Sequence, residues 1–409
     1  MAAQSLDVGH AGCRDVLKLA AERLGWEVAL HHGGTCVWVD SERDASERLG
    51  RLRRGQWLSW IAGVQEACGK VALAEALQAR GAVFWPRSWR VPQVSTEVIC
   101  EEAFRGNSSS GTLIVKPDLG SQGSGISLAQ SQQELGRVVK QLPPEGGIVQ
   151  EYIDRPLLLD GFKWDARIYV LAFPHPGGGW ACFLAGEGLV RVCSEPYQQP
   201  TAANLQQSMV HLTNYSLNKY SDKYAHNSDP TDASHGCKRT LSAVLRRLEE
   251  QTESGFSAQA IWQALGQLSR ETVEAVVAQL PDARDDRRDR CFHLLGLDIL
   301  LDEAGRPWLL EANHRPSLLV DEIHPLACGQ SREEVNRLFA AEKRNSTAGP
   351  RWGRPCRCSL HPSPHTHQPC AIDVAAKLLA VQGALQIVEK AKEGREVNSW
   401  AEGTGYTLV

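Results

Sequence analysis

The chain lacks the features that would place it in several specialised classes of protein. Its net charge is only −4, so no overall excess of positive charge favours nucleic acid as a partner. No run of about eighteen apolar residues occurs, and Cys13 and Arg14 interrupt the only stretch that resembles the apolar part of a signal peptide. The 12 cysteines are scattered rather than densely spaced. We therefore expect a cytoplasmic protein with free thiols, no membrane segment and no nucleic-acid partner.

The remaining composition is that of an ordinary globular protein. Apolar residues make up 42% and charged residues 22% of the 409 residues, enough for one large core or two to three lobes. No internal repeat is present, and strand and helix patterns are mixed, which predicts an α/β or α+β architecture. Strands are expected at 36–39, 112–116, 147–152, 163–173, 180–184, 188–192, 294–301 and 308–313. Helices are expected within 13–30, 71–79, 132–141, 234–280 and 371–392, with a loop at 106–111 and frayed last residues.

The most informative stretch is Asp-Gly-Phe-Lys-Trp-Asp-Ala-Arg at 160–167, which leads into an apolar run. Period two places Lys163, Asp165 and Arg167 on one face of the expected strand, and the intervening side chains face a core. Lysine is a compact charge suited to phosphate and arginine a planar fork suited to carboxylate, so this face suits anions. An edge strand with a solvated face and one ion pair would give the same pattern.

A lysine at a strand end precedes a glycine-rich turn. Lys116 is followed by Gly120, Gly123 and Gly125. Glycine lets the backbone approach a ligand closely, and successive N–H groups can form an anion nest. The spacing is neither that of a P-loop nor that of a dinucleotide fingerprint, and an extended stretch follows from Ile126. The turn therefore predicts either a lid over nucleotide phosphates or only a glycine-rich hairpin.

Candidate oxygen ligands lie on two later strands. Asp298 lies in Gly-Leu-Asp-Ile-Leu-Leu, and Glu311 and Asn313 end the strand that follows the turn at 302–307. A hairpin brings the carboxylates together, and two carboxylates with one amide oxygen fit Mg²⁺ on nucleotide phosphates. The alternative is a buried acid in a salt bridge, because an unpaired carboxylate in an apolar strand is costly.

Five motifs in order resemble the tubulin tyrosine ligase-like family, a branch of the ATP-grasp carboxylate–amine ligases. They are the glycine-rich turn after Lys116, Val-Gln-Glu-Tyr-Ile at 149–153, the 161–167 motif, Met-Val-His-Leu-Thr-Asn-Tyr-Ser-Leu-Asn-Lys at 209–219, and Leu-Glu-Ala-Asn-His-Arg-Pro-Ser at 310–317. The resemblance implies an α/β (α+β) ATP-grasp-like fold with three lobes around a nucleotide cleft. The expected divisions are an N-terminal segment 1–29, a ligase domain 30–320 (lobes 30–105, 106–175 and 176–320), an irregular Cys/His/Pro-rich insertion 321–370, a closing helix 371–392 and a tail 393–409.

Motif by motif, the resemblance also implies the roles of individual residues. The implied catalytic residues are Lys163, Asp165, Arg167 and Arg191. The implied ATP-binding residues are Lys116, Gln122, Gly123, Gly125, Ile126, Gln150, Glu151, Tyr152, Ile153, Lys163, Asp165, Thr213 and Asn214. The amino-acid substrate would be held by Arg167, Arg191, Thr213 and Asn214. The implied ligands of Mg²⁺, with Mn²⁺ as a substitute, are Asp298, Glu311 and Asn313.

Within the family, the motifs resemble glutamylases more than glycylases or tyrosine ligases. The resemblance implies an ATP-dependent polyglutamylase that joins free L-glutamate to glutamate side chains of α- or β-tubulin C-terminal tails through an acyl phosphate. Gln122 and His314 resemble residues of chain-extending members and are assigned to acceptor preference, while Ser121, Ser124 and Arg315 depart from the pattern. We expect a monomer on microtubules of the cytoplasm and cytoskeleton, including those of a cilium, flagellum or basal body.

Other interpretations stay open for parts of the chain. The whole could be a glycylase, a tyrosine ligase or a pseudoenzyme that binds nucleotide and microtubules without ligation. A Cys/His-rich segment predicts either a zinc site or a loop without metal; its residues are Cys356, Cys358, His361, His365, His367 and Cys370.

A basic run predicts either a solvated helix face or a recruiting surface for acidic tails; its residues are Arg43, Arg48, Arg51, Arg53 and Arg54, with Lys238 and Arg239. No long basic extension follows the core before Val409, so the core itself or a partner is expected to engage the substrate.

Overall fold

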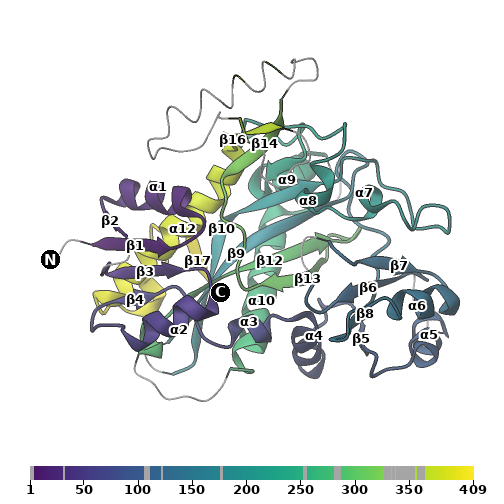
Figure 1. The fold of residues 1–409 in the computed structure, drawn as a ribbon, viewed down its shortest axis with the longest axis horizontal. Coiled ribbons are helices and arrows are strands. Elements are labelled where there is room, and N and C mark those ends of the chain that lie inside the picture. The colour runs from purple at the N-terminus through teal and green to yellow at the C-terminus, as the bar shows by residue number, and fades with distance from the viewer. Residues whose placement is uncertain are drawn as a thin grey trace.

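The fold combines four sheets with helices packed against them (Figure 1). A computed structural model describes residues 4–30, 33–105, 111–120, 123–175, 178–251, 256–280, 287–326, 355–356 and 364–409, with the single residues 333 and 337. The mixed α/β class expected from the sequence is confirmed. The predicted loop at 106–111 lies outside the described residues except for Gly111.

The central sheet has six strands and carries the charged motif. Its order is β11 (Lys238–Thr240), β10 (Trp180–Val192), β9 (Trp164–Pro174), β12 (His293–Leu301) and β13 (Pro307–Asn313), with β17 (Tyr406–Leu408) also paired to β10. All of these pairs are antiparallel. The two strands expected at 180–184 and 188–192 are one strand, β10, whose register on β9 shifts between Leu184 and Gly188.

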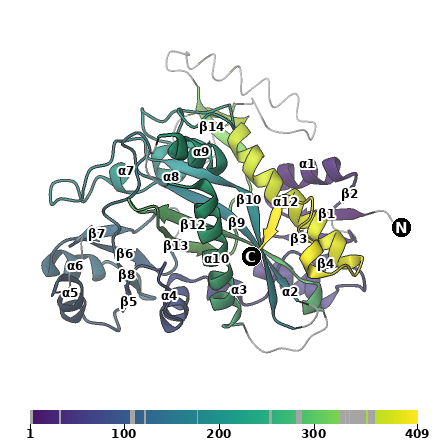
Figure 2. The ribbon, with the colours of Figure 1, turned by 180° about the vertical axis from the view of Figure 1, so that it is seen from behind.

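Two further sheets lie at opposite ends of the long axis in both views (Figures 1 and 2). At one end, parallel strands follow the order β2 (Glu27–Ala29), β1 (Ser5–His10), β3 (Cys36–Val39) and β4 (Trp57–Leu58), together with α1 (Arg14–Leu24) and α2 (Glu42–Gly50). At the other end, antiparallel strands follow the order β5 (Ser88–Val91), β8 (Gly147–Glu151), β6 (Leu113–Pro117) and β7 (Ser127–Ala129). Helices α5 (Thr96–Arg105) and α6 (Gln132–Val139) share a core with this second sheet. Because β1 pairs with β3, the first sheet joins residues on both sides of position 30.

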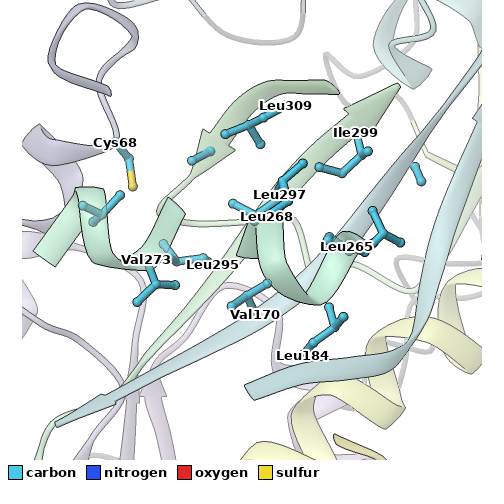
Figure 3. Close-up of a cluster of buried hydrophobic side chains, with 14 of the residues drawn as sticks. Cys68, Val170, Leu184, Leu265, Leu268, Val273, Leu295, Leu297, Ile299 and Leu309 are labelled. Carbon is cyan, nitrogen blue, oxygen red and sulfur yellow. The ribbon is translucent and has the colours of Figure 1, made fainter. Parts of the chain in front are cut away.

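Each face of the central sheet packs into its own core, as the period of two requires. On one face, Ile168, Val170 and Leu297 pack with α9 (Leu241–Gln251) and α10 (Ala258–Val277), in the cluster drawn in Figure 3. On the other face, Tyr169, Leu171 and Phe173 pack with α1 and α12 (Ala371–Lys392). The helices α3 (Val64–Ala67) and α4 (Lys70–Ala79) contribute to the first of these cores.

Helix α12 begins and ends at the residues that the sequence predicted. Among the described residues, it is the one helix that is long and apolar enough to cross a membrane by length and composition alone. In this fold 67% of its apolar stretch is buried, and it packs against α1 and β10. A helix that is apolar on all sides is expected where protein surrounds it. Here α12 is a core helix.

Two regions expected to be irregular are ordered where the structure describes them. Strands β14 (Asp321–Pro325), β15 (Pro355–Cys356) and β16 (His365–Pro369) form an antiparallel sheet within the predicted insertion. The last residues do not fray, because Tyr406 donates its hydroxyl hydrogen to Ala380 O (2.8 Å) and Val409 N–H donates to Cys182 O (2.9 Å). Proline and histidine content suggested a loop at 321–370, but the strand pairing outweighs that composition.

The close packing of the C-terminal residues on α12 predicts the effect of one methyl group. A Cβ at Gly383 would lie 2.5 Å from Thr404 O and 2.6 Å from the Tyr406 ring. Gly383→Ala should therefore destabilise the protein by about 1–3 kcal/mol through overpacking. Gly136→Ala in α6 is the matched control, since its Cβ would meet nothing within 4 Å, and should stabilise by up to about 1 kcal/mol. Urea unfolding measures both changes, and equal effects of the two variants would contradict this account.

Candidate functional site

A pocket of about 700 Å³, including its solvent-open part, lies between the central sheet and the β5–β8 sheet. Thirteen residues predicted from the sequence line it: Lys116, Ile126, Gln150, Glu151, Tyr152, Ile153, Lys163, Asp165, Arg191, Thr213, Asn214, Asp298 and Glu311. Apolar walls with a few charged groups are typical of sites for a cofactor or a small ligand. The residues come from β6, β8, β9, β10, β12, β13 and the segment between α7 (Ser208–His211) and α8 (Tyr215–Asn218).

Strand register places the charged residues in a row across the central sheet. Arg191 on β10 lies opposite Asp165 on β9, and Arg167 on β9 lies opposite Asp298 on β12. Asp298 in turn lies opposite Glu311 on β13. Residues opposite each other on antiparallel strands have neighbouring side chains, so the row brings opposite charges together.

The row forms a closed set of buried ion pairs. Arg167 donates from Nε and Nη2 to the two carboxylate oxygens of Asp298, the latter bond measuring 2.9 Å. Arg191 donates from Nε to Asp165 Oδ1 (2.8 Å), and its Nη2 lies 2.9 Å from Asp298 Oδ2. All four side chains are 12% exposed or less. The solvated edge strand considered above is therefore wrong: this face is buried.

The carboxylates at the end of the row fit a hard divalent cation. Burial opposes ionisation of Asp298, but Arg167 and Arg191 outweigh it and lower the pKa of this carboxyl group. Burial, and next the charge of Asp298, raises the pKa of Glu311. Two buried carboxyl groups in contact repel each other when both are ionised, and a cation would remove that repulsion. Asn313 adds an amide, whose Nδ2 donates to Glu311 Oε1 (3.1 Å).

Two buried lysines enter the pocket from different sheets. Lys116 donates from Nζ to Gln150 Oε1 (2.6 Å) and to Leu310 O (3.2 Å). The carbonyl of Leu310 is available because the β12–β13 register shifts at this point, between Asp298 and Ile299. Lys163 donates to the Tyr152 hydroxyl (2.8 Å). Burial lowers the pKa of each lysine to about 8.

A hydrogen-bonded chain fixes the orientation of Tyr152. His211 Nε2 lies 3.1 Å from Asn204 O, and because a carbonyl only accepts, Nε2 carries the proton. His211 Nδ1 therefore accepts from the Tyr152 hydroxyl, at 3.3 Å. Burial lowers the pKa of His211, which favours this neutral imidazole. The chain holds the tyrosine oxygen toward Lys163.

Sequence reasoning missed six lining residues: Pro86, Ile114, His211, Leu212, Leu300 and Leu310. Ile114 lies two positions before Lys116 on β6, and Leu300 two positions after Asp298 on β12. Period two along each strand could have identified both. Pro86 belongs to no strand, and only the tertiary fold brings it to the pocket.

Several predicted residues do not line this pocket. Gly123 and Gly125 have positive φ, and a Cβ on Gly125 would meet Pro117 Cγ at 2.8 Å, so the turn requires glycine there. Gln122 lies outside the described residues. Arg167, which belongs to the row of charges, and Asn313, which donates to Glu311, do not line the pocket. His314 lines a second hollow with Asp40, Trp60 and Arg315.

The predicted basic surface is only partly present. Arg43, Arg51, Arg53 and Arg54 are exposed. Arg48 is instead partly buried, and its Nη2 lies 2.7 Å from His10 Nε2. Lys238 and Arg239 are corrections, because both are 5% exposed or less. Lys238 donates to Asp373 (2.5 Å), and Arg239 donates to the carbonyl of Gly236 (3.0 Å). These two residues are structural and cannot attract an acidic tail.

The predicted zinc ligands do not converge among the residues that the structure describes. His365 and His367 lie on β16, where His367 contacts Asp321. Cys370 donates its thiol hydrogen to Glu322 Oε1 (2.5 Å) instead. Cys358, His361 and the Cys356 side chain lie outside the described residues. The nine cysteines whose side chains are described are all free thiols.

Comparison with known proteins decides the family. The model of the tubulin-tyrosine ligase family matches residues 64–326, which include the whole pocket. This chain belongs to the tubulin-tyrosine ligase family. It is 34% identical over 336 residues to tubulin polyglutamylase TTLL11 of Mus musculus, covering 77% of this chain and 44% of that protein. It is 31% identical over 321 residues to tubulin polyglutamylase ttll6 of Danio rerio, covering 75% of this chain and 38% of that protein. The chain thus matches less than half the length of these relatives.

For this member of the family, the row of charges predicts a large loss of stability when one charge is removed. Asp298→Asn preserves shape but leaves two buried guanidinium groups to share Asp165. Breaking a buried pair in this way should lower the free energy of unfolding by about 3–5 kcal/mol. Glu274→Gln is the control, because Glu274 forms an ion pair with Arg80 at the surface, where the two side chains are 48% and 42% exposed, respectively. This variant should change the free energy of unfolding by less than about 1 kcal/mol. Similar losses in the two variants, measured by urea unfolding, would contradict this prediction.

Proposed function

We propose that this protein is an ATP-dependent tubulin polyglutamylase that joins glutamate to glutamate side chains of tubulin tails. The observation that carries the proposal is one pocket lined by two buried lysines, by Asp298 with Glu311 and by Arg191, with Arg167 bound to Asp298. These are the groups needed for phosphate, for a divalent cation and for the carboxylate of an amino acid. The relatives reported above are both named tubulin polyglutamylases, which supports the choice of reaction.

The pocket offers separate surfaces for the base and the phosphates of a nucleotide. Its apolar lining comes from Ile114, Ile126, Ile153, Leu300 and Leu310. This lining suits an adenine ring, with Gln150 and Glu151 at its edge. Lys116 and Lys163 both line the same cavity, and their ammonium groups would hold the phosphates. Their burial strengthens that attraction, because water does not screen it.

Asp298, Glu311 and Asn313 would hold Mg²⁺, the cation that their oxygen chemistry fits. When bound, the ion would neutralise charge that develops on the transferred phosphoryl group. The chain's own contribution is to keep the two carboxylates opposite each other through the β12–β13 register. Neither residue depends on a mobile loop for its position, since both lie within strands.

Arg167 and Arg191 would bind the α-carboxylate of free glutamate. Each uses Nε and Nη2 for the chain's own carboxylates. Among the described residues, Nη1 of each arginine has no hydrogen-bond partner. Asp165 and Asp298 thus orient the two guanidinium groups and leave Nη1 of each arginine to donate to the substrate. Without these two aspartates, the two arginines would be uncompensated buried charges.

The reaction consistent with this arrangement has two steps. A carboxylate oxygen of the acceptor glutamate attacks the γ-phosphorus of ATP, forming an acyl phosphate and releasing ADP. The amine of free glutamate then attacks the acyl carbon, the C–O bond to phosphate breaks, and inorganic phosphate leaves. The amine loses a proton and an amide bond remains. Phosphate and ADP, rather than AMP, are the expected products.

The direct test is to incubate the purified chain with ATP, tubulin and labelled glutamate, glycine or tyrosine separately. We expect incorporation of glutamate alone, dependent on ATP, with ADP and phosphate as products. Glu311→Gln should reduce turnover by at least about 100-fold while the fold persists, because a transition-state charge loses its counterion. Glu303→Gln, an exposed acid paired with Arg155, is the control and should remain active. Incorporation of another amino acid, formation of AMP, or an active Glu311→Gln would overturn the proposal.

The proposal extends to chain elongation, and His314 is the described residue assigned to it. His314 lies in the second hollow with Arg315 and with Asp40, the residue that directly follows β3. Two tubulin-tail peptides, one bare and one with a single branch glutamate, distinguish the alternatives. Faster reaction with the branched peptide is expected, and a preference for the bare peptide would reject elongation alone. We place the activity on microtubules of the cytoskeleton, including those of cilia.

Nucleotide affinity should depend on pH through the buried lysines. Because burial lowers the pKa of Lys116 and Lys163 to about 8 in the free protein, both are charged below pH 7 and lose their protons above pH 8. Affinity for ADP should therefore be constant below about pH 7 and fall above pH 8, by up to about tenfold per pH unit for each lysine. Calorimetric titration from pH 6.5 to 9.5 measures this fall.

Two variants identify the group responsible for that pH dependence. Lys163→Arg keeps its charge throughout the range and should reduce the slope. Lys223→Arg, at a side chain that is 64% exposed, should keep the wild-type slope. An affinity that does not change between pH 7 and 9 in the wild-type protein would refute the assignment.

A further inference from the structure

A second group of candidate metal ligands lies away from the pocket, beside the β14–β16 sheet. His226, Glu322 and His324 each offer one ligand atom, and the three atoms lie within 4.8 Å of one another. Glu322 and His324 share a face of β14 by period two. His226 comes from the segment between α8 and β11, about a hundred residues earlier. None of the three lines the pocket described above.

The contacts within this group favour a cation more than a simple ion pair. His226 Nδ1 contacts Glu322 Oε2, and the rings of His226 and His324 stack with centroids 3.8 Å apart at 15°. Two stacked imidazoles cannot both be protonated without repulsion, so at least one presents a lone pair. One carboxylate and two imidazole nitrogens are then gathered at one place. This is the donor set of many zinc sites.

The surrounding residues hold the carboxylate in position. The second oxygen of Glu322 accepts from the Cys370 thiol (2.5 Å) and lies 3.4 Å from Lys238 Nζ. Lys238 is itself paired with Asp373 (2.5 Å), and Asp373 also pairs with Lys377. The two lysines balance the charges of Glu322 and Asp373, so these four buried groups are neutral together. Groups that fix a ligand in this way are typical of metal sites.

We propose that His226, Glu322 and His324 bind a Zn²⁺ ion through two imidazole nitrogens and one carboxylate oxygen. The His226 side chain is 32% exposed and that of Glu322 is 3% exposed. The site thus has a buried side and a side open to solvent, through which the ion enters and from which water completes its coordination. The site does not depend on the proposed ligase activity.

A zinc ion here would fix one wall of the nucleotide pocket. The Tyr215 hydroxyl accepts from Ile323 N–H (3.3 Å), between the two proposed ligands on β14. Tyr215 directly follows Thr213 and Asn214, which line the pocket. The ion would join the segment that carries His226 to β14, and so hold this wall against the β14–β16 sheet and the start of α12.

The test is zinc binding by the purified full chain after treatment with a chelator. Equilibrium dialysis against Zn²⁺ gives the number of ions bound and their affinity, and Co²⁺ absorption reports imidazole ligation. His226→Gln and His324→Gln should each remove one bound zinc or weaken it more than about tenfold, since even residues that only orient a ligand change affinity 10- to 100-fold. His235→Gln is the matched control, because His235 lies in the same segment, is 81% exposed and contacts Asp232.

Zinc can also bind to Asp298 and Glu311 in the nucleotide pocket. The measured quantity is therefore the difference in bound zinc between the wild-type protein and each variant. Circular dichroism with chelator present shows whether each variant is folded. His226 is the more exposed ligand, so His226→Gln remains informative if His324→Gln does not fold. Wild-type zinc stoichiometry and affinity in a folded His226→Gln, or no zinc bound by the wild type, would overturn the proposal.

Discussion

The alternating charges across β10, β9 and β12 are the interaction on which the pocket depends. Arg191, Asp165, Arg167 and Asp298 are all buried, and each arginine is held by a carboxylate from a neighbouring strand. Removing four charges from water is expensive, and an apolar row of equal volume would often be equally or more stable. Stability alone therefore does not account for this row. Three of its members, Arg191, Asp165 and Asp298, line the pocket, so the row also forms part of the pocket wall.

The parts of the fold that follow from local patterns were predictable. Helix α12 and strand β3 have the predicted bounds because apolar spacing alone defines them. The face carrying Lys163, Asp165 and Arg167 was also predictable, since alternation along one strand fixes which side chains lie together. Trp164 and Ala166 pack into the opposite core as expected.

The partners of those residues could not be predicted in the same way. Whether Arg167 meets Asp298 depends on the register between two strands about 130 residues apart in the chain, and period two within one strand carries no information about that register. The same limit explains Lys238, whose sequence neighbours suggested a basic surface. Its burial depends on Asp373, which lies 135 positions away. The group of His226, Glu322 and His324 was missed for this reason too.

Strand β17 has a consequence for synthesis of the chain on the ribosome. Its residues pair with Phe183, Leu184 and Ala185 on β10, and Tyr406 and Trp400 complete the core that α12 shares with β9. Until residue 408 has left the exit tunnel, the core around Phe173 and Phe183 lacks the strand β17 that pairs with β10. Domains generally fold as units during translation, and exposed apolar surface in incomplete units promotes aggregation. The pocket residues are therefore made before the strand that completes the core behind them, and the nascent polypeptide carries this incomplete apolar core until β17 has been made.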